Sequence, residues 1–347
     1  MEQRRSGRQK CSKGGEKLIR ISQLKLPITH TKAQLEKKIA KTLKNPGNSF
    51  TYEIKKQSLD CRHKNDKIFV YTVDVTIRDE QKLAKKVNNN SIMLTKEKPY
   101  EFPSPGETPL LHSPVIVGSG PAGLFCGWYL AKAGYCPIIL ERGEEAEKRQ
   151  KTVENFWKNG VLDPESNVQF GEGGAGTFSD GKLNTLVKDP YGRNHEVLKR
   201  FVAAGAPEEI IYQQKPHLGT DVLVGIVEKM RHEIEEMGGK FCFRSKVTDL
   251  IFENNTLKEI EINNDKRIPA QVCVLAPGHS ARDTFEMLQK RGVYMEPKSF
   301  AVGLRIEHPQ EMINMDLYGE PENELLGAAS YKVTHKCANG RGVYSFC

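Results

Sequence analysis

The chain has 347 residues, of which 38% are hydrophobic and 28% charged. This composition excludes a disordered chain, a collagen-like fibre and a disulfide scaffold, and the length favours roughly two or three folded domains. The formal net charge of +8 is uneven, because residues 1–110 carry a net charge of +12 and the remainder carries −4. The basic segment is either a solvated Lys-rich face or a surface that attracts nucleic acid.

Neither a secretory signal nor a membrane span is expected. The first residues lack the apolar segment of a signal peptide, and the eight cysteines show neither C-x-x-C nor zinc-finger spacing. Residues 109–131 contain no charged side chain, but their glycines and prolines divide them into a short strand and a helix. We therefore expect a cytoplasmic protein without a bound metal and without a membrane partner.

The N-terminal elements alternate between strand and helix. Residues 1–17 are polar and basic, which is typical of a flexible tail. Alternating apolar residues then predict a strand over 18–26, with a one-residue slip in phase before Leu24. A helix with a capping box begins at Thr31, and residues 45–47 end it. The remaining elements are expected at residues 50–55, 68–77, 80–87 and 92–94.

The order β-α-β-β-α-β predicts a ferredoxin-like α+β module over residues 18–97. Prolines crowd residues 98–112, so this stretch is expected to be a linker. An α/β, Rossmann-like domain with a parallel sheet and an appended β-meander is expected over residues 113–283, and residues 284–347 begin an incomplete substrate domain. Its strands and helices are expected at residues 114–117, 121–132, 137–140, 240–243, 246–252, 256–262 and 271–276, with a further helix capped by Thr220 or Asp221.

A glycine motif lies between the first strand and the first helix of the second domain. Residues Gly118-Ser119-Gly120-Pro121-Ala122-Gly123 fit the pattern G-x-G-x-x-G. The first glycine permits the tight turn, the second lets a diphosphate approach the backbone, and the third lets the helix pack closely on the strand. The diphosphate then lies at the positive end of the helix dipole. Glu141, at the end of the next strand, is expected to bind the ribose hydroxyls of the dinucleotide.

A second glycine run, Gly171-Glu172-Gly173-Gly174-Ala175-Gly176, matches the same pattern without a flanking strand and helix. No acidic residue closes a following strand, so a second dinucleotide site is not expected here. The run is either a flexible loop or a loop whose backbone lies against a flat or anionic ligand, and we favour the ligand loop.

Residues 115–124 and the sequence Glu141-Arg142-Gly143 resemble the FAD-binding start of the glutathione-reductase-type flavoproteins. The Pro-Ala pair inside the motif points to FAD rather than NAD. Further stretches resemble a narrower group, the bacterial-type FAD-dependent dehydrogenases with an N-terminal ferredoxin-like domain. These stretches are residues 173–183, 216–221, 276–283 and 300–308.

The resemblance implies which residues contact FAD. In the family, the second loop lines the flavin, a later strand clasps adenine with its backbone, and an Ala-Thr-Gly turn passes the cofactor. Pro277 departs from the threonine of that turn and removes a backbone N–H. The FAD contacts implied in this sequence are Gly118, Ser119, Gly120, Pro121, Ala122, Gly123, Glu141, Arg142, Gly174, Thr177, Ser179, Lys182, Val247, Ala276 and Gly278.

The function that the resemblance implies is an FAD-dependent oxidoreductase that exchanges hydride or electrons with a small molecule, with NAD(P)H as one candidate electron donor. The late Gly-Asp turn that closes such sites is missing, so we expect a C-terminally truncated chain. Two alternatives stay open: an RNA-modifying flavoprotein whose basic module holds nucleic acid, and a non-catalytic remnant. The redox-active cysteine pair of the disulfide reductases is absent. The polar candidates near the flavin are Lys182, His217, His279 and Arg305, none of which is assigned to catalysis.

Overall fold

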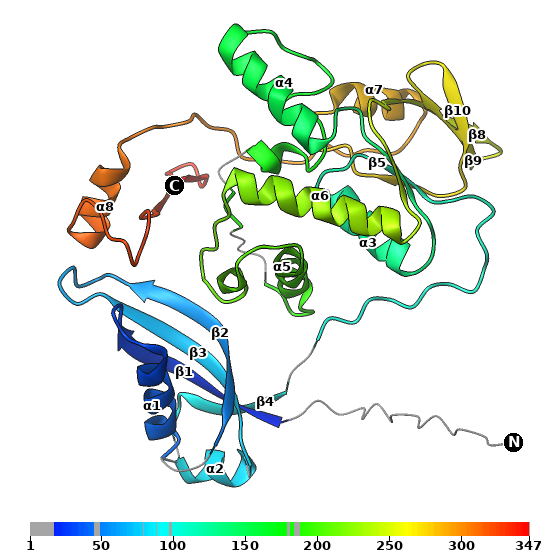
Figure 1. The fold of residues 1–347 in the computed structure, drawn as a ribbon. Coiled ribbons are helices and arrows are strands. Elements are labelled where there is room, and N and C mark those ends of the chain that lie inside the picture. Colours follow the sequence, from blue (N-terminus) through cyan, green and yellow to red (C-terminus); the bar gives the residue numbers. More distant parts are fainter. Residues whose placement is uncertain are drawn as a thin grey trace, which may run out of the picture. The chain divides into compact units, whose positions relative to one another are not determined.

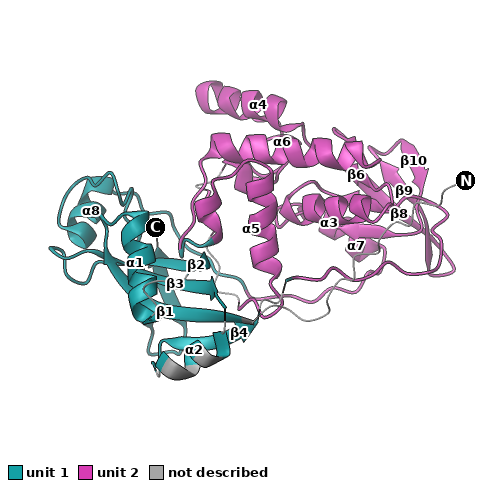
Figure 2. Ribbon diagram, turned by 60° about the horizontal axis from the view of Figure 1, so that its bottom comes forward, with its two compact units in different colours: residues 1–99, 212–214, 300–347 teal, residues 100–211, 215–299 magenta. Residues whose placement is uncertain are grey.

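The computed structural model describes residues 17–44, 49–78, 80–87, 89–96, 99–178, 181–183 and 188–346. The expected helix end at residues 45–47, and the expected tail up to residue 16, lie outside these ranges. The chain forms two compact units, which Figure 2 shows in different colours. The first unit consists of residues 1–99, 212–214 and 300–347, and the second of residues 100–211 and 215–299.

The first unit contains a four-stranded antiparallel sheet with the strand order β2-β3-β1-β4. Helix α1 packs on this sheet, where its Leu35 and Ile39 share a core with Ile21 and Val73 (Figure 1). This is the ferredoxin-like arrangement that the sequence predicts. The bounds are β1 Lys17–Pro27, α1 Lys32–Thr42, β2 Thr51–Asp60, β3 Ile68–Thr76, α2 Glu80–Val87 and β4 Ile92–Lys96.

Two local predictions in this unit are confirmed. The slip in phase before Leu24 is a register shift between Ile21 and Leu24 in the pairing of β1 with β3. At the start of α1, the backbone N–H of Gln34 donates to Thr31 Oγ1 at 3.3 Å, and the N–H of Thr31 donates to Gln34 Oε1 at 2.7 Å. The capping box therefore forms and satisfies the first free N–H groups of the helix.

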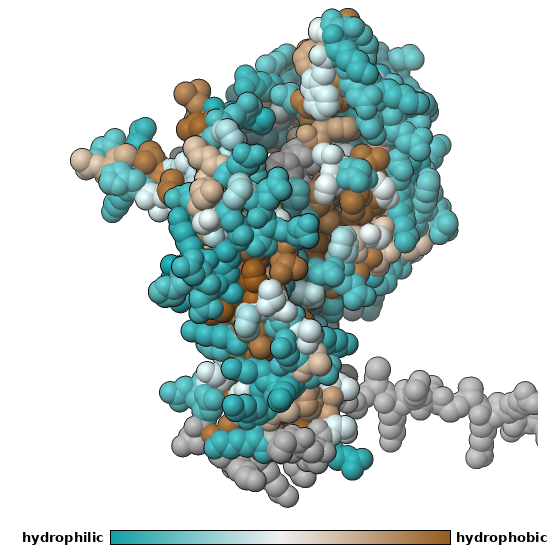
Figure 3. Space-filling view, turned by 60° about the vertical axis from the view of Figure 1, so that its left-hand side comes forward, coloured by the Kyte–Doolittle hydropathy of each residue, from teal (hydrophilic) through white to brown (hydrophobic). Residues whose placement is uncertain are grey.

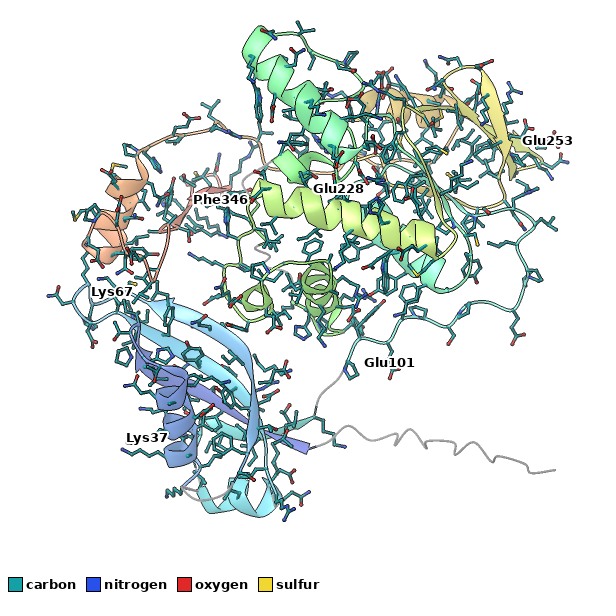
Figure 4. All side chains as sticks on the ribbon, in the orientation of Figure 1. Lys37, Lys67, Glu101, Glu228, Glu253 and Phe346 are labelled. Atoms are coloured by element: carbon teal, nitrogen blue, oxygen red, sulfur yellow. The ribbon has the colours of Figure 1, made fainter. Side chains whose placement is uncertain are left out.

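Residues 300–346 complete the described part of the first unit. Lys67, labelled in Figure 4, forms an ion pair with Glu320 at 2.7 Å and so ties this segment to the start of β3. The stretch before α8 exposes apolar side chains, among them Val302 and Leu304. Figure 3 shows hydrophobic residues scattered over a largely hydrophilic surface. The elements are α8 (Gln310–Tyr318), β12 (Lys332–Lys336) and β13 (Gly342–Phe346).

The second unit is built on a four-stranded parallel sheet in the order β11-β5-β6-β7, and an antiparallel meander, β10-β9-β8, follows β7 in the sequence. Helices α3 and α6 lie side by side (Figure 1), and Leu124 of α3 and Ile226 of α6 share a core with Ile116 of β5. The α/β class with a parallel sheet and a meander is therefore confirmed. The bounds are β5 Val115–Val117, α3 Pro121–Lys132, β6 Ile138–Leu140, α6 Thr220–Glu236, β7 Lys240–Cys242, β8 Val247–Glu253, β9 Thr256–Ile262, β10 Lys266–Pro269 and β11 Cys273–Leu275.

The beginning of α6 differs from the prediction. Its N-cap is Gly219, and no side chain caps the helix, so the expected cap at Thr220 or Asp221 is wrong. Asp221 instead lies in the first turn, where a carboxylate still favours the positive helix end. Four helices were not expected from the sequence: α4 (Ala146–Asn159), α5 (Arg193–Ala203), α7 (Arg282–Lys290) and α8.

The proline-rich stretch at residues 98–112 is partly anchored to the second unit. Phe102 stacks on Tyr129 of α3 with the ring centroids 4.4 Å apart, and the N–H of Leu111 donates to Gln271 Oε1 at 3.0 Å. The C-terminal boundary of this unit also differs from the expected one, because residues 284–299 stay with it. Within the described ranges, no helix has both the length and the apolar content that crossing a membrane requires.

Candidate functional site

The first glycine loop connects β5 to α3. Gly118 has a φ of +98°, and a Cβ there would lie 2.3 Å from the carbonyl oxygen of Ala276. A Cβ on Gly123 would lie 1.9 Å from the carbonyl oxygen of Gly118. Gly120 is the N-cap of α3, and a Cβ there would meet only the Cα of Gly174, at 3.8 Å. The fold therefore requires the first and third glycines, whereas it leaves free space at the second.

Glu141 directly follows β6 and connects this loop to neighbouring segments through hydrogen bonds. Its side chain is almost fully buried, and Oε2 accepts hydrogen bonds from the backbone N–H and the hydroxyl of Ser119, both at 2.8 Å. Oε1 accepts from the backbone N–H groups of Gly143 and Gly171, at 2.9 and 3.0 Å. A single carboxylate thus joins the first glycine loop to the second one.

The second glycine loop lies directly against the first. The N–H of Gly173 donates to the carbonyl oxygen of Ser119 at 3.0 Å. A Cβ on Gly174, whose φ is +68°, would lie 3.1 Å from the Cα of Gly120. A side chain at position 174 would crowd the backbone of Gly120, so this close approach depends on the glycine at position 174.

Arg149 of α4 donates hydrogen bonds to the backbone of the second loop and to the residues before it. Its side chain is completely buried, and Nη1 donates to the carbonyl oxygens of Glu172 at 2.7 Å and Gly174 at 2.9 Å. Nε donates to the carbonyl oxygen of Asn167 at 2.9 Å. Burial lowers the pKa of Arg149 to about 10, and the charges of Glu141 and Glu172 oppose this change. The guanidinium therefore stays protonated at neutral pH.

Glu172 connects the same loop to two helices. Its carboxylate is buried and accepts from the backbone N–H of Ala146, the first residue of α4, at 2.8 Å. It also accepts from Arg231 Nε of α6 at 2.8 Å. Burial raises the pKa of Glu172, while these two donors oppose the increase. Glu228 lies one turn before Arg231 on α6 and is labelled in Figure 4; burial raises its pKa as well.

A cavity of about 370 Å³ opens where the glycine loops meet the C-terminal ends of β5, β6 and β11. Arg142 and Lys246 contribute to its wall, and each forms ion pairs with both Glu165 and Asp283, at 2.7–2.9 Å. The Arg142 guanidinium lies 4.2 Å from the ring centroid of Phe170, which also lines the cavity. Two cations paired with two anions thus enclose one side of the site.

The structure brings most of the expected site residues to this cavity. Ser119, Gly123 and Thr177 are buried and do not line it. Lys182 pairs with His217 in an isolated bridge outside the lining, and Ser179 lies outside the described residues. Those that line the cavity are Gly118, Gly120, Pro121, Ala122, Glu141, Arg142, Gly174, Val247, Ala276 and Gly278.

Of the polar candidates, His279 lines the cavity, and Arg305 belongs to the first unit. The sequence did not indicate Arg149, Glu172 or Lys246 as residues of the site. Glu172 lies inside the glycine run that was singled out, so its position was a usable signal. Among the described residues, no group of His, Cys, Asp and Glu is arranged to hold a metal ion.

The site fits a dinucleotide. Gly120 and Gly174 present bare backbone to the cavity beside the N-terminus of α3, where the helix dipole favours a diphosphate. Behind the second loop, Arg149 Nη2 and Thr177 Oγ1 are buried and have no hydrogen-bond partner among the described residues.

Three family models match parts of the chain. A domain of unknown function matches residues 18–76, an NAD(P)-binding Rossmann-like domain matches residues 116–151, and the C-terminal domain-like family of FAD-dependent proteins matches residues 299–347. An uncharacterized protein of Clostridium beijerinckii is 45% identical over 332 residues, which cover 95% of this chain. The chain spans 62% of that relative's length.

Solved structures of low similarity include THI4 of Thermovibrio ammonificans, which is 21% identical with a TM-score of 0.35, the match covering 52% of this chain and 62% of that one. L-proline dehydrogenase from P. horikoshii is 17% identical, with a TM-score of 0.29 and coverages of 52% and 56%. Two of the family models match the segments where the glycine motif and the later resemblance lie, so residues 116–151 are similar to a Rossmann-like nucleotide-binding domain and residues 299–347 to the C-terminal domain of FAD-dependent proteins.

Proposed function

We propose that the chain binds FAD between its two glycine loops and serves an oxidoreductase that acts on a small molecule. The observation that carries this proposal is the close approach of Gly120 to Gly174 at the mouth of the cavity. Two bare backbones beside a helix N-terminus suit a diphosphate-bearing ligand, and the FAD-dependent family match favours FAD.

Different residues around the cavity would contact different parts of FAD. The N-terminus of α3 at Gly120 would stabilise the negative diphosphate, and Arg142 and Lys246, each paired with carboxylates, would form one side of the cavity. Val247 of β8 and the turn at Ala276 would flank the nucleotide end of the ligand. When bound, FAD supplies hydride or electron transfer, and the protein supplies its position and electrostatics.

Gly120 offers a test that separates binding from folding. Its φ is −66°, and an alanine Cβ would make only an ordinary contact inside the protein. Gly120→Ala should therefore fold normally, yet its methyl group should obstruct the ligand and weaken FAD binding by about tenfold or more. Gly225→Ala on α6, where a Cβ meets nothing within 4 Å, is the matched control.

The measurement is FAD retained after gel filtration, together with fluorescence titration of FAD into each protein. We expect a stable complex with the wild type and with Gly225→Ala, and bleaching of its flavin absorbance by NADH or NADPH. Equal affinity in Gly120→Ala would show that FAD does not lie between these loops. A wild type that retains no FAD and binds none on titration would refute the proposal.

A further inference from the structure

The carboxylate of Glu141 has no acceptor position to spare. A carboxylate offers about four lone-pair sites, and four protein donors lie within 3.0 Å of its two oxygens. Three of these donors are backbone N–H groups, on Ser119, Gly143 and Gly171. The fourth is the Ser119 hydroxyl, whose side chain is fully buried. A ribose hydroxyl that donates to Glu141 must therefore replace one of the four.

The three backbone donors are fixed in place. A Cβ on Gly143 would lie 2.6 Å from the Cα of Gly171, so these two segments are in direct contact. Arg149 holds Gly171 through its carbonyl oxygen at 3.3 Å, and the carbonyl oxygen of Ser119 accepts from Gly173. By contrast, the Ser119 hydroxyl can leave Glu141 by rotation about a single side-chain bond.

Building on the proposed FAD site, we propose that Ser119 is a positioning residue whose hydroxyl occupies Oε2 of Glu141 until a ribose hydroxyl of the dinucleotide takes over that acceptor. In the ligand-free protein the hydroxyl keeps the buried carboxylate fully hydrogen-bonded, which a buried charge requires. In the complex the hydroxyl turns away. Each binding event thus exchanges one hydrogen bond to Glu141 for another, and Ser119 lowers the affinity for any ligand that carries the ribose diol.

Removal of the competitor should strengthen binding. Ser119→Ala leaves an acceptor of Glu141 open, so we expect FAD to bind about three- to tenfold more tightly than to the wild type, the upper value corresponding to about 1.4 kcal/mol. The same gain should occur with ADP, which carries both ribose hydroxyls. It should be lost with 2′,3′-dideoxy-ADP, which has no ribose hydroxyl to donate.

A second readout follows the ligand-free protein. Ser119→Ala should lower the Tm of the ligand-free protein, because the buried carboxylate loses a hydrogen bond. Saturating FAD should reduce the difference in Tm between the variant and the wild type. Ser166→Ala is the matched control: this serine is also fully buried, and its hydroxyl donates to Glu144 Oε2 at 3.4 Å away from the cavity lining. Its FAD affinity should equal that of the wild type.

The outcomes are distinct. Unchanged or weaker FAD binding by a folded Ser119→Ala protein would overturn the role of Ser119, as would an equal gain with the dideoxy nucleotide. If the alanine variant does not fold, Ser119→Cys provides the same test, because a thiol is a weaker donor at the same position, and its affinity should exceed that of the wild type. Failure of the wild type itself to bind FAD or ADP would instead refute the proposed function.

Discussion

The first glycine loop, residues 118–123, is shaped mainly by steric contacts with backbone atoms, whereas the second, residues 171–176, is held by buried charged side chains that link it to helices α4 and α6. In the first, the carbonyl oxygen of Gly118 excludes a side chain at Gly123. In the second, buried Arg149 and Glu172 link the backbone to α4 and α6. Both loops reach the same cavity.

This difference predicts that different kinds of substitution destabilise the two loops. A loop shaped by steric contacts fails when atoms are added to it. A loop held by buried charges fails when a distant partner is removed, because the remaining groups stay buried without compensation. Substitutions of each kind therefore test whether the two loops are stabilised as the contacts indicate.

Arg149→Met should produce the largest effect. The apolar side chain fills similar space but removes this donor from the carbonyl oxygens of Asn167, Glu172 and Gly174, and it removes the positive charge that lies near Glu141 and Glu172. We expect a loss of about 3–5 kcal/mol in the free energy of unfolding. Urea denaturation followed by circular dichroism measures this loss.

The control for this variant is Lys148→Met, which removes a cation from the adjacent, solvent-exposed position on α4. Its ion pair with Glu145 lies at the surface, so its removal should have no measurable effect on unfolding. Equal losses in the two variants would show that Arg149 does not hold the second loop.

Gly123→Ala tests the first loop and should cost less. The added Cβ would lie 1.9 Å from the carbonyl oxygen of Gly118, so α3 must shift away from β5. We expect a loss of about 1–3 kcal/mol in the free energy of unfolding, as for other overpacked sites. Gly225→Ala, in open space on α6, should be neutral or stabilising by up to about 1 kcal/mol. A Gly123→Ala protein as stable as this control would contradict a steric origin of the loop.

The same contrast explains which parts of the molecule could be predicted from the sequence. The capping box at Thr31 and the close packing of Gly123 on Gly118 depend on residues a few positions apart, so their pattern is visible in the chain. Helix α4 was missed because its buried face is small and contains an arginine beside Ala146 and Val153. Gly160, which ends that helix in the left-handed conformation, was the signal that could have located it.

The partners of Arg149 could not be predicted for a related reason. They are backbone carbonyl oxygens 18 to 25 positions away, on a loop whose path depends on the completed fold. Similarly, Glu141 was expected to face a ribose, and its four protein donors became evident only when both loops were placed. Long-range polar contacts of this kind leave no period in the sequence.

Glu172→Gln tests the second loop through the pH dependence of the free energy of unfolding. Burial raises the pKa of Glu172 above its ordinary value of 4.5, so between these two values the native state binds more protons than the unfolded state and stability falls as pH rises. Glutamine has no such dependence. The stability of the wild type relative to Glu172→Gln should therefore increase as the pH is lowered from 7 towards 4.5. Urea denaturation at several pH values measures this, and a decrease on acidification would contradict it.

Asp283→Asn should show the opposite dependence and the smallest effect, since this carboxylate is partly exposed. The hydrogen bonds of Asp283 to Arg142 and Lys246 hold its pKa well below the ordinary value of 3.8. Its contribution to stability is then present above about pH 4 and is lost as the pH falls through the lowered pKa. The advantage of the wild type over Asp283→Asn should shrink between pH 6 and pH 3, and 1 M salt should reduce it at every pH. The same urea series provides the measurement. The same pH dependence of stability in the Asp283 and Glu172 variants would contradict this prediction. It would show that the ion pairs beside the cavity and the buried carboxylate of the second loop do not differ as their burial and partners indicate.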